Sequence, residues 1–203
     1  MTTTLESPAS KADFAVARKA MIDSQLRTSG VNEDFVLARM GAVAREDHVP
    51  ASARGTAYMD RAIRLPDGGH LPSPVFHGMM LAEARPGPDD TVTIVDGGSG
   101  YLAALVEPLV KSVTVLTPDE AAGSSRKGNN ATLLLVDGAL EHIPAALAKM
   151  LADGGRVVTG VVENGVTRLA TGRKSDAGVA LMPLAEIGAP RFGQFDRPQR
   201  WSF

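Results

Sequence analysis

Apolar residues recur every three or four positions over residues 12–29 and again after Asn32, a spacing that predicts two amphipathic helices. Gly30 suits the end of the first helix, because glycine tolerates the left-handed backbone found there. Asn32 is the predicted N-cap of the second helix, and Pro50 closes the helical region. Residues 51–75 carry many Pro and Gly turn signals, so an irregular connection is predicted there.

From residue 91 onward the pattern changes to short apolar runs that alternate with helical stretches. The runs predict four buried strands, and the last part of the chain predicts a closing hairpin or edge strands. This alternation indicates an α/β fold with a mostly parallel sheet. The predicted strands cover 91–95, 112–116, 131–136 and 156–162, the helices 101–109 and 144–151, and the hairpin 165–171 and 179–183.

The same changes of pattern divide the chain into three parts. Residues 1–10 are rich in Thr and Ser and are predicted to form a flexible tail. Residues 11–75 form the predicted N-terminal helical cap, and residues 76–203 hold the sheet.

Composition and charge exclude several classes of function. The chain has 203 residues with a formal net charge of −2, which argues against a nucleic-acid binder and a basic membrane anchor. Cysteine is absent, so disulfides, thiolate catalysis and cysteine-bound zinc are excluded. No apolar run reaches the ~18 residues of a membrane span, and a secretory signal is missing, so a cytoplasmic protein is expected. The four histidines lack metal-ligand spacing, so no metal site is predicted.

A glycine-rich turn between a predicted strand and a predicted helix carries the clearest chemistry. Glycines there let a ligand approach the backbone, at the edge of an α/β sheet where ligands bind. The turn matches neither the dinucleotide fingerprint nor the P-loop. A ligand site and a plain tight turn therefore both remain open. The candidate cofactor-binding residues are Asp96, Gly97, Gly98, Ser99 and Gly100.

A ribose-binding site normally adds an acidic residue at the end of the next strand. Thr117 stands at that place, with Asp119 and Glu120 two and three residues later. Thr117 is a candidate for one neutral hydrogen bond to a ribose. Loss of the charge-assisted bond costs about 1.5–3 kcal/mol.

Several stretches in the right order resemble the protein-L-isoaspartate O-methyltransferase family. The resemblance implies a Rossmann-like class I methyltransferase sheet with an N-terminal helical cap. It also implies S-adenosylmethionine as methyl donor and, as acceptor, the free carboxylate of an L-isoaspartyl residue in a damaged protein. Such a methyl ester then collapses to a succinimide. The matching stretches are 17–26, 30–31, 36–40, 43–50, 57–63, the glycine turn, 134–144 and 153–155.

The chain departs from the family pattern at the donor and acceptor sites. Ile94 and Asp96 stand where the family has an acidic residue and a glycine, and Thr117 stands at the ribose glutamate. The family's acceptor-loop serine falls on Pro72, so Ser73, one place later, and His70 are the catalytic candidates.

Only residues 118–130 connect two predicted strands where the family has a further strand and helix, so one strand-helix unit is predicted to be deleted. The strand 112–116 then becomes an edge that needs cover, and a homodimer would provide it.

Two functions follow from these observations. One is an active methyltransferase in which Asp96, Gly98 and Gly100 hold the methionine end of the donor and Ser73 orients the acceptor. The other is an inactive relative that serves as a binding or scaffold module.

Two further features bear on the site. Asp137 and Glu141 follow the third strand, where they would compensate for lost acids. The aromatic tail 195–203, with Trp201 and Phe203, is expected to dock on the core.

Overall fold

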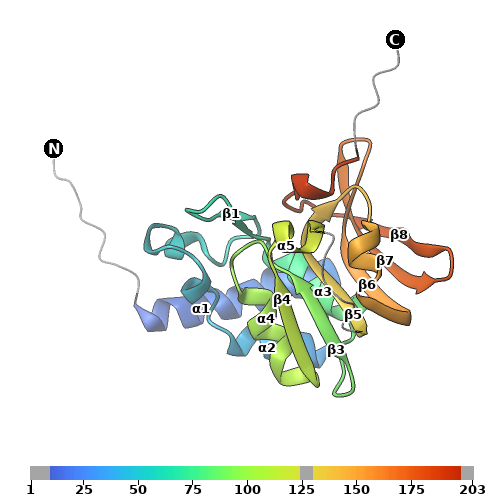
Figure 1. The fold of residues 1–203 in the computed structure, drawn as a ribbon. Coiled ribbons are helices and arrows are strands. Elements are labelled where there is room, and N and C mark those ends of the chain that lie inside the picture. Colours follow the sequence, from blue (N-terminus) through green and yellow to red (C-terminus); the bar gives the residue numbers. More distant parts are fainter. Residues whose placement is uncertain (1–9, 124–129, 198–203) are drawn as a thin grey trace, which may run out of the picture.

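The computed structural model describes residues 10–123 and 130–197 and confirms an α/β fold around one mixed sheet (Figure 1). Six strands lie in the order β4-β3-β5-β6-β7-β8. The pairs from β4 to β6 are parallel, and β7 and β8 close the sheet as an antiparallel hairpin. The strands are β3 (Thr91–Val95), β4 (Ser112–Leu116), β5 (Ala131–Leu140), β6 (Leu151–Glu163), β7 (Val166–Ser175) and β8 (Gly178–Glu186).

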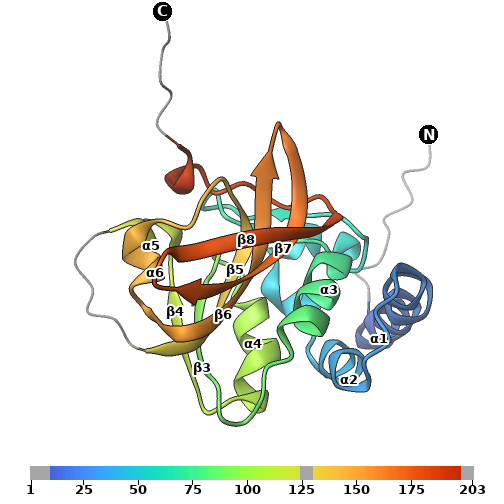
Figure 2. The same cartoon turned by 90° about the vertical axis from the view of Figure 1, so that its right-hand side faces the viewer.

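Helices cover both faces of this sheet (Figure 2). The larger core lies between one face and the N-terminal helices, and the smaller core lies under α5 and α6 on the other face. Continuous burial of β3 and β5 follows from this layering, because parallel strands are covered on both sides. The helices are α1 (Lys11–Met21), α2 (Asp34–Ala42), α3 (Pro74–Ala84), α4 (Tyr101–Val106), α5 (Pro118–Ala122) and α6 (Ala145–Ala148).

The first helix continues beyond α1 through a π-turn and a 3-10 turn to Ser29. Gly30 then ends it with a φ of 86°, as expected for glycine at this position. The prediction that Asn32 caps α2 is wrong. Glu33 is the N-cap, since its carbonyl accepts the first helical hydrogen bond, from Leu37, while its side chain accepts from the Asn32 backbone N–H.

Residues 51–75 contain more structure than an irregular loop. The antiparallel pair β1 (Ile63–Arg64) and β2 (His70–Leu71) closes a turn, and a 3-10 turn occupies Ala51–Thr56. Another 3-10 turn, Arg45–His48, directly precedes this region. The short β1–β2 pair places the predicted acceptor loop directly against the main sheet.

The predicted bounds of β3 and β4 are confirmed, whereas other elements differ in length. β5 runs through Asp137 and Gly138 to Leu140, and α6 is shorter than predicted because β6 already begins at Leu151. The connection after β4 contains α5, a short helix that the sequence analysis did not predict. Within the described residues β4 is an edge strand and β5 lies beside β3, as the shortened connection predicts.

Candidate functional site

The glycine turn leaves the carboxyl end of β3, and Asp96 organises it from inside. The Asp96 carboxylate is 4% exposed and accepts hydrogen bonds from the backbone N–H groups of Gly98 and Gly100. It therefore faces its own loop and holds the loop's shape. Gly98 and Gly100 have φ values of 102° and 65°, which L side chains rarely adopt, so both glycines are required by the backbone.

The glycine loop and the predicted acceptor loop touch through their backbones. The His70 N–H donates to the Gly97 carbonyl oxygen over 3.0 Å. A Cβ added at Gly69 would lie only 1.9 Å from that same oxygen. The structure thus brings His70 next to Gly97, and it places both loops at the carboxyl edge of the sheet.

Thr117 has a local partner that the sequence interpretation missed. Its hydroxyl caps α5 by accepting from the Glu120 N–H over 3.2 Å, and the Glu120 carboxylate accepts from the Thr117 N–H over 3.0 Å. This reciprocal arrangement is a capping box. A ribose at the end of β4 would meet a threonine whose oxygen already serves a helix.

Ser73 also acts as a helix cap. Its hydroxyl accepts from the Phe76 N–H over 3.3 Å, and Asp60 accepts from the Val75 N–H over 3.1 Å. Together the two side chains satisfy two of the first-turn donors of α3.

We expect Ser73→Ala to lower the free energy of unfolding by about 1 kcal/mol, because Ala removes the capping oxygen. Ser73→Thr keeps that oxygen and is the matched control, with an expected loss of less than half as much. Urea unfolding of the two variants measures the difference. Equal stability of Ser73→Ala and the wild type would contradict the capping role.

A cavity of about 510 Å³ opens beside Ser73 and His70. Its wall combines the acceptor loop with the segment that follows β8, so it lies next to the glycine loop. Burial, and then the charge of Arg64, lower the pKa of the His70 imidazole. The cavity is lined by Asp60, Arg61, Ala62, His70, Ser73 and Ile187 to Arg191.

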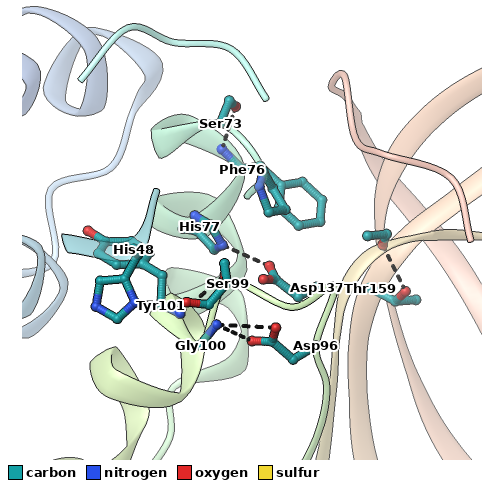
Figure 3. A network of polar contacts seen from close by, with 12 residues as sticks. His48, Ser73, Phe76, His77, Asp96, Ser99, Gly100, Tyr101, Asp137 and Thr159 are labelled. Atoms are coloured by element: carbon teal, nitrogen blue, oxygen red, sulfur yellow. Dashed lines mark hydrogen bonds and ion pairs between the residues drawn. The ribbon is translucent and has the colours of Figure 1, made fainter. Parts of the chain in front are cut away.

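A buried polar network lies behind this edge of the sheet (Figure 3). His77 on α3 bonds Asp137 on β5 through Nε2 and Oδ1, which are 2.7 Å apart, and both side chains are fully buried. His77 Nδ1 lies 3.2 Å from Nη1 of Arg45, which is itself completely buried. Arg45 also donates to the carbonyls of Ala57 and Pro72 and stacks over the Tyr101 ring.

Sequence reasoning missed this network, apart from Asp137. The pattern around Arg45 contributes only to the family resemblance, and His77 enters the sequence analysis only as one of four histidines without metal-ligand spacing. No local signal marks either side chain as buried, because arginine is among the most exposed residue types.

Two acidic side chains, Asp96 just after β3 and Asp137 on β5, lie close together at the carboxyl end of β3. Asp96 and Asp137 lie side by side (Figure 3), and burial, followed by the charge of Asp137, raises the pKa of the Asp96 carboxyl. Oδ2 of Asp137 is buried and meets no hydrogen-bond partner within residues 10–123 and 130–197. A buried carboxylate oxygen without a donor favours a cationic or donor group beside it.

The segment after β8 returns across the carboxyl ends of the strands. Phe192 is 6% exposed and Phe195 1% exposed, and they pack in the smaller core with Val95 and Leu116. Phe195 thus docks on the core as expected, whereas Trp201 and Phe203 lie outside the described residues. Glu141, predicted to compensate for lost acids, instead pairs with Arg191.

The described residues also bear on membrane-spanning helices and metal sites. No helix within residues 10–123 and 130–197 has the length and apolarity needed to cross a membrane. The described part of the chain also contains no cluster of three side chains suited to hold a metal ion.

Comparison with known proteins gives the family. A model of the protein-L-isoaspartate(D-aspartate) O-methyltransferase family matches residues 16–121. A protein-L-isoaspartate O-methyltransferase of Koribacter versatilis is 32% identical over 170 residues, covering 71% of this chain and 76% of the relative. Another, of Methylorubrum populi, is 27% identical and covers 89% of this chain and 90% of the relative.

Solved structures agree on the fold. A methyltransferase of this kind from Plasmodium falciparum, in complex with S-adenosyl-L-homocysteine, superposes with a TM-score of 0.71 at 15% identity. That alignment covers 89% of this chain and 98% of the other. The segment that the family model matches contains most of the helical cap, the acceptor loop and the glycine turn described above. The chain belongs to the protein-L-isoaspartate O-methyltransferase family and has its Rossmann-like class I methyltransferase fold.

Proposed function

We propose that the chain transfers a methyl group from S-adenosylmethionine to the free carboxylate of an isoaspartyl residue in a damaged protein or peptide. The observation that carries the proposal is the contact between the two loops. The glycine loop at the end of β3 and the acceptor loop at His70 share a hydrogen bond and border the same edge of the sheet. Methyl transfer needs little covalent chemistry from a protein, since proximity and in-line placement supply most of the rate.

The residues at the end of β3 and β5 suit the proposed donor. S-adenosylmethionine carries an ammonium and a sulfonium charge, and Asp96 and Asp137 supply negative charge at short range. Oδ2 of Asp137 lacks a partner among the described residues, which an ammonium N–H would provide. When bound, the donor supplies an electrophilic methyl carbon to an incoming carboxylate oxygen. The chain's part is to orient the two groups and exclude water.

The cavity beside His70 suits a carboxylate acceptor. Arg61 supplies an exposed guanidinium at its wall, and guanidinium groups match carboxylates well. The pKa of His70 is lowered, so its imidazole is neutral at pH 7 and offers a hydrogen bond without a charge. Arg61 therefore anchors the acceptor in this proposal, and His70 borders the reacting carboxylate.

The test uses two peptides that differ only in an isoaspartyl or an ordinary aspartyl residue. With radiolabelled S-adenosylmethionine we expect base-labile methyl ester on the isoaspartyl peptide alone. Equal label on both peptides would contradict the substrate assignment. Label on neither, with the donor shown to bind by calorimetry, would contradict the acceptor site but leave the donor site intact.

We expect Arg61→Ala to raise KM for the isoaspartyl peptide about tenfold while kcat changes little, because a binding interaction of about 1.4 kcal/mol is lost. Arg27→Ala, which removes an exposed arginine at the end of the first helix, outside the lining of this cavity, is the control with an expected change below twofold. Steady-state kinetics separate the two constants. An unchanged KM in Arg61→Ala would remove Arg61 from the acceptor site.

The inactive binding or scaffold module gains no support from the comparisons.

The homodimer stays a prediction that rests on the edge position of β4, where Val115 is 46% exposed. Light scattering at micromolar concentration gives the oligomeric state.

A further inference from the structure

The crevice that would receive the donor contains a side chain of the protein itself. In an open α/β sheet ligands bind outside the carboxyl ends of the strands. A Cβ added at Gly97, just after β3, would lie 3.4 Å from the Phe192 ring. A Cβ added at Gly138, near the end of β5, would lie 2.8 Å from it. The ring therefore sits between the ends of β3 and β5.

The ring fits this place closely. Gly97 and Gly138 lack the side chains that would displace it, and Phe195 packs against it with a centroid separation of 6.3 Å. Leu116 and Ala121, at the end of β4 and on α5, belong to the same apolar cluster. The two aromatic rings therefore share one apolar cluster with the short connection that follows β4.

The docked segment is held by backbone pairing and by exposed polar contacts. Its backbone pairs with Ala139, which donates to Pro190 O over 2.7 Å and accepts from Phe192 N over 2.9 Å. Exposed polar contacts add to this, since Arg191 pairs with Glu141 and Gln194 bonds Asp119. Figures 1 and 2 show this C-terminal turn beside α5.

The base of the segment is anchored on the sheet. Ile187 and Ala189 are bonded to Thr167 on β7, so the base of the segment stays on the sheet. Gly188 stands between them, and an added Cβ there would meet nothing within 4 Å. Movement of the residues beyond Ala189 would clear the crevice while this base keeps its bonds to Thr167 on β7.

We propose that residues 190–196 form a displaceable plug, in which Phe192 occupies the donor crevice between the ends of β3 and β5, so that docking of the plug and binding of the donor exclude each other. The inference rests on the proposed function and adds a means of regulation to it. The apparent affinity for the donor is then the intrinsic affinity reduced by the fraction of molecules with the plug open.

Calorimetric titration with S-adenosylhomocysteine tests the exclusion. We expect Phe192→Ala to bind it at least tenfold more tightly than the wild type, because truncation weakens the docked state. Phe35→Ala, a partly buried phenylalanine of α2, controls for general loosening and is expected to leave the affinity within twofold. Equal affinity in the wild type and Phe192→Ala would overturn the plug but leave the proposed function standing. Binding by neither, up to millimolar ligand, would overturn both.

Hydrogen exchange on the wild-type chain gives an answer that does not depend on a variant's folding. At saturating S-adenosylhomocysteine we expect peptides covering 190–196 and Ala139 to exchange at least tenfold faster, as their backbone pairing is lost. Slower or unchanged exchange with ligand bound would show the segment staying docked and would overturn the plug.

Discussion

Arg45→Met is expected to lower the free energy of unfolding by about 3–5 kcal/mol, the cost of leaving a buried charge without its partner. Arg45 is completely buried and joins the 3-10 turn Arg45–His48 to Pro72, His77 and the Tyr101 ring. Its charge also acts on Asp137, which lies beyond His77 in the same network. Methionine fills similar volume, so the loss measures the charge and the hydrogen bonds. Urea unfolding followed by circular dichroism gives the value.

Arg39→Met is the matched control for this change. Arg39 is half-buried and donates to the carbonyls of Ala104 and Leu105, with no buried carboxylate among its contacts within the described residues. We expect it to cost about 1 kcal/mol. If the two substitutions lower the free energy of unfolding equally, the buried network of Arg45 adds no more stability than the half-buried contacts of Arg39.

Gly69→Ala is expected to reduce kcat/KM for methyl transfer by about a hundredfold, because it separates the two loops that we propose hold donor and acceptor. The added Cβ would lie 1.9 Å from the Gly97 oxygen, so the β1–β2 turn must move away by more than 1 Å. A displacement of about 1 Å between reacting groups can cost two orders of magnitude in rate. Steady-state transfer to the isoaspartyl peptide gives the ratio.

Gly188→Ala is the corresponding control, since it lines the same cavity and an added Cβ meets nothing within 4 Å. We expect its kcat/KM to stay within about threefold of the wild type. Thermal unfolding of both variants separates local displacement from general loss of fold. A Gly69→Ala enzyme with full activity would disconnect the loop contact from catalysis.

The sheet was predictable where local patterns decide the structure. The apolar runs at 91–95 and 112–116 became β3 and β4 with the predicted bounds, because each run is bordered by turn residues. β5 is longer than predicted, since Asp137 interrupts its apolar run while His77, far away in sequence, bonds one oxygen of the carboxylate. Such a partner is invisible to a local pattern.

The candidate site was predictable only in part for the same reason. The structure brings the glycine turn and His70 together, a contact that the sequence did not predict. Thr117 was read as a ribose ligand, although the capping-box spacing to Glu120 was present in the sequence. Phe192 carries no local signal, since Gly97 and Gly138 lie far from it along the chain. The sequence analysis expected the aromatic tail 195–203 to dock on the core, but Phe192 precedes that tail.

We propose that the donor binds in the crevice where β3, β4 and β5 end. Backbone amide signals of the isotope-labelled chain, followed by NMR during titration with S-adenosylhomocysteine, test it directly. We expect the largest shifts at Gly97, Gly98 and Gly100, with accompanying shifts in residues 190–196. Shifts centred instead on residues of another cavity, or none at millimolar ligand, would contradict the account.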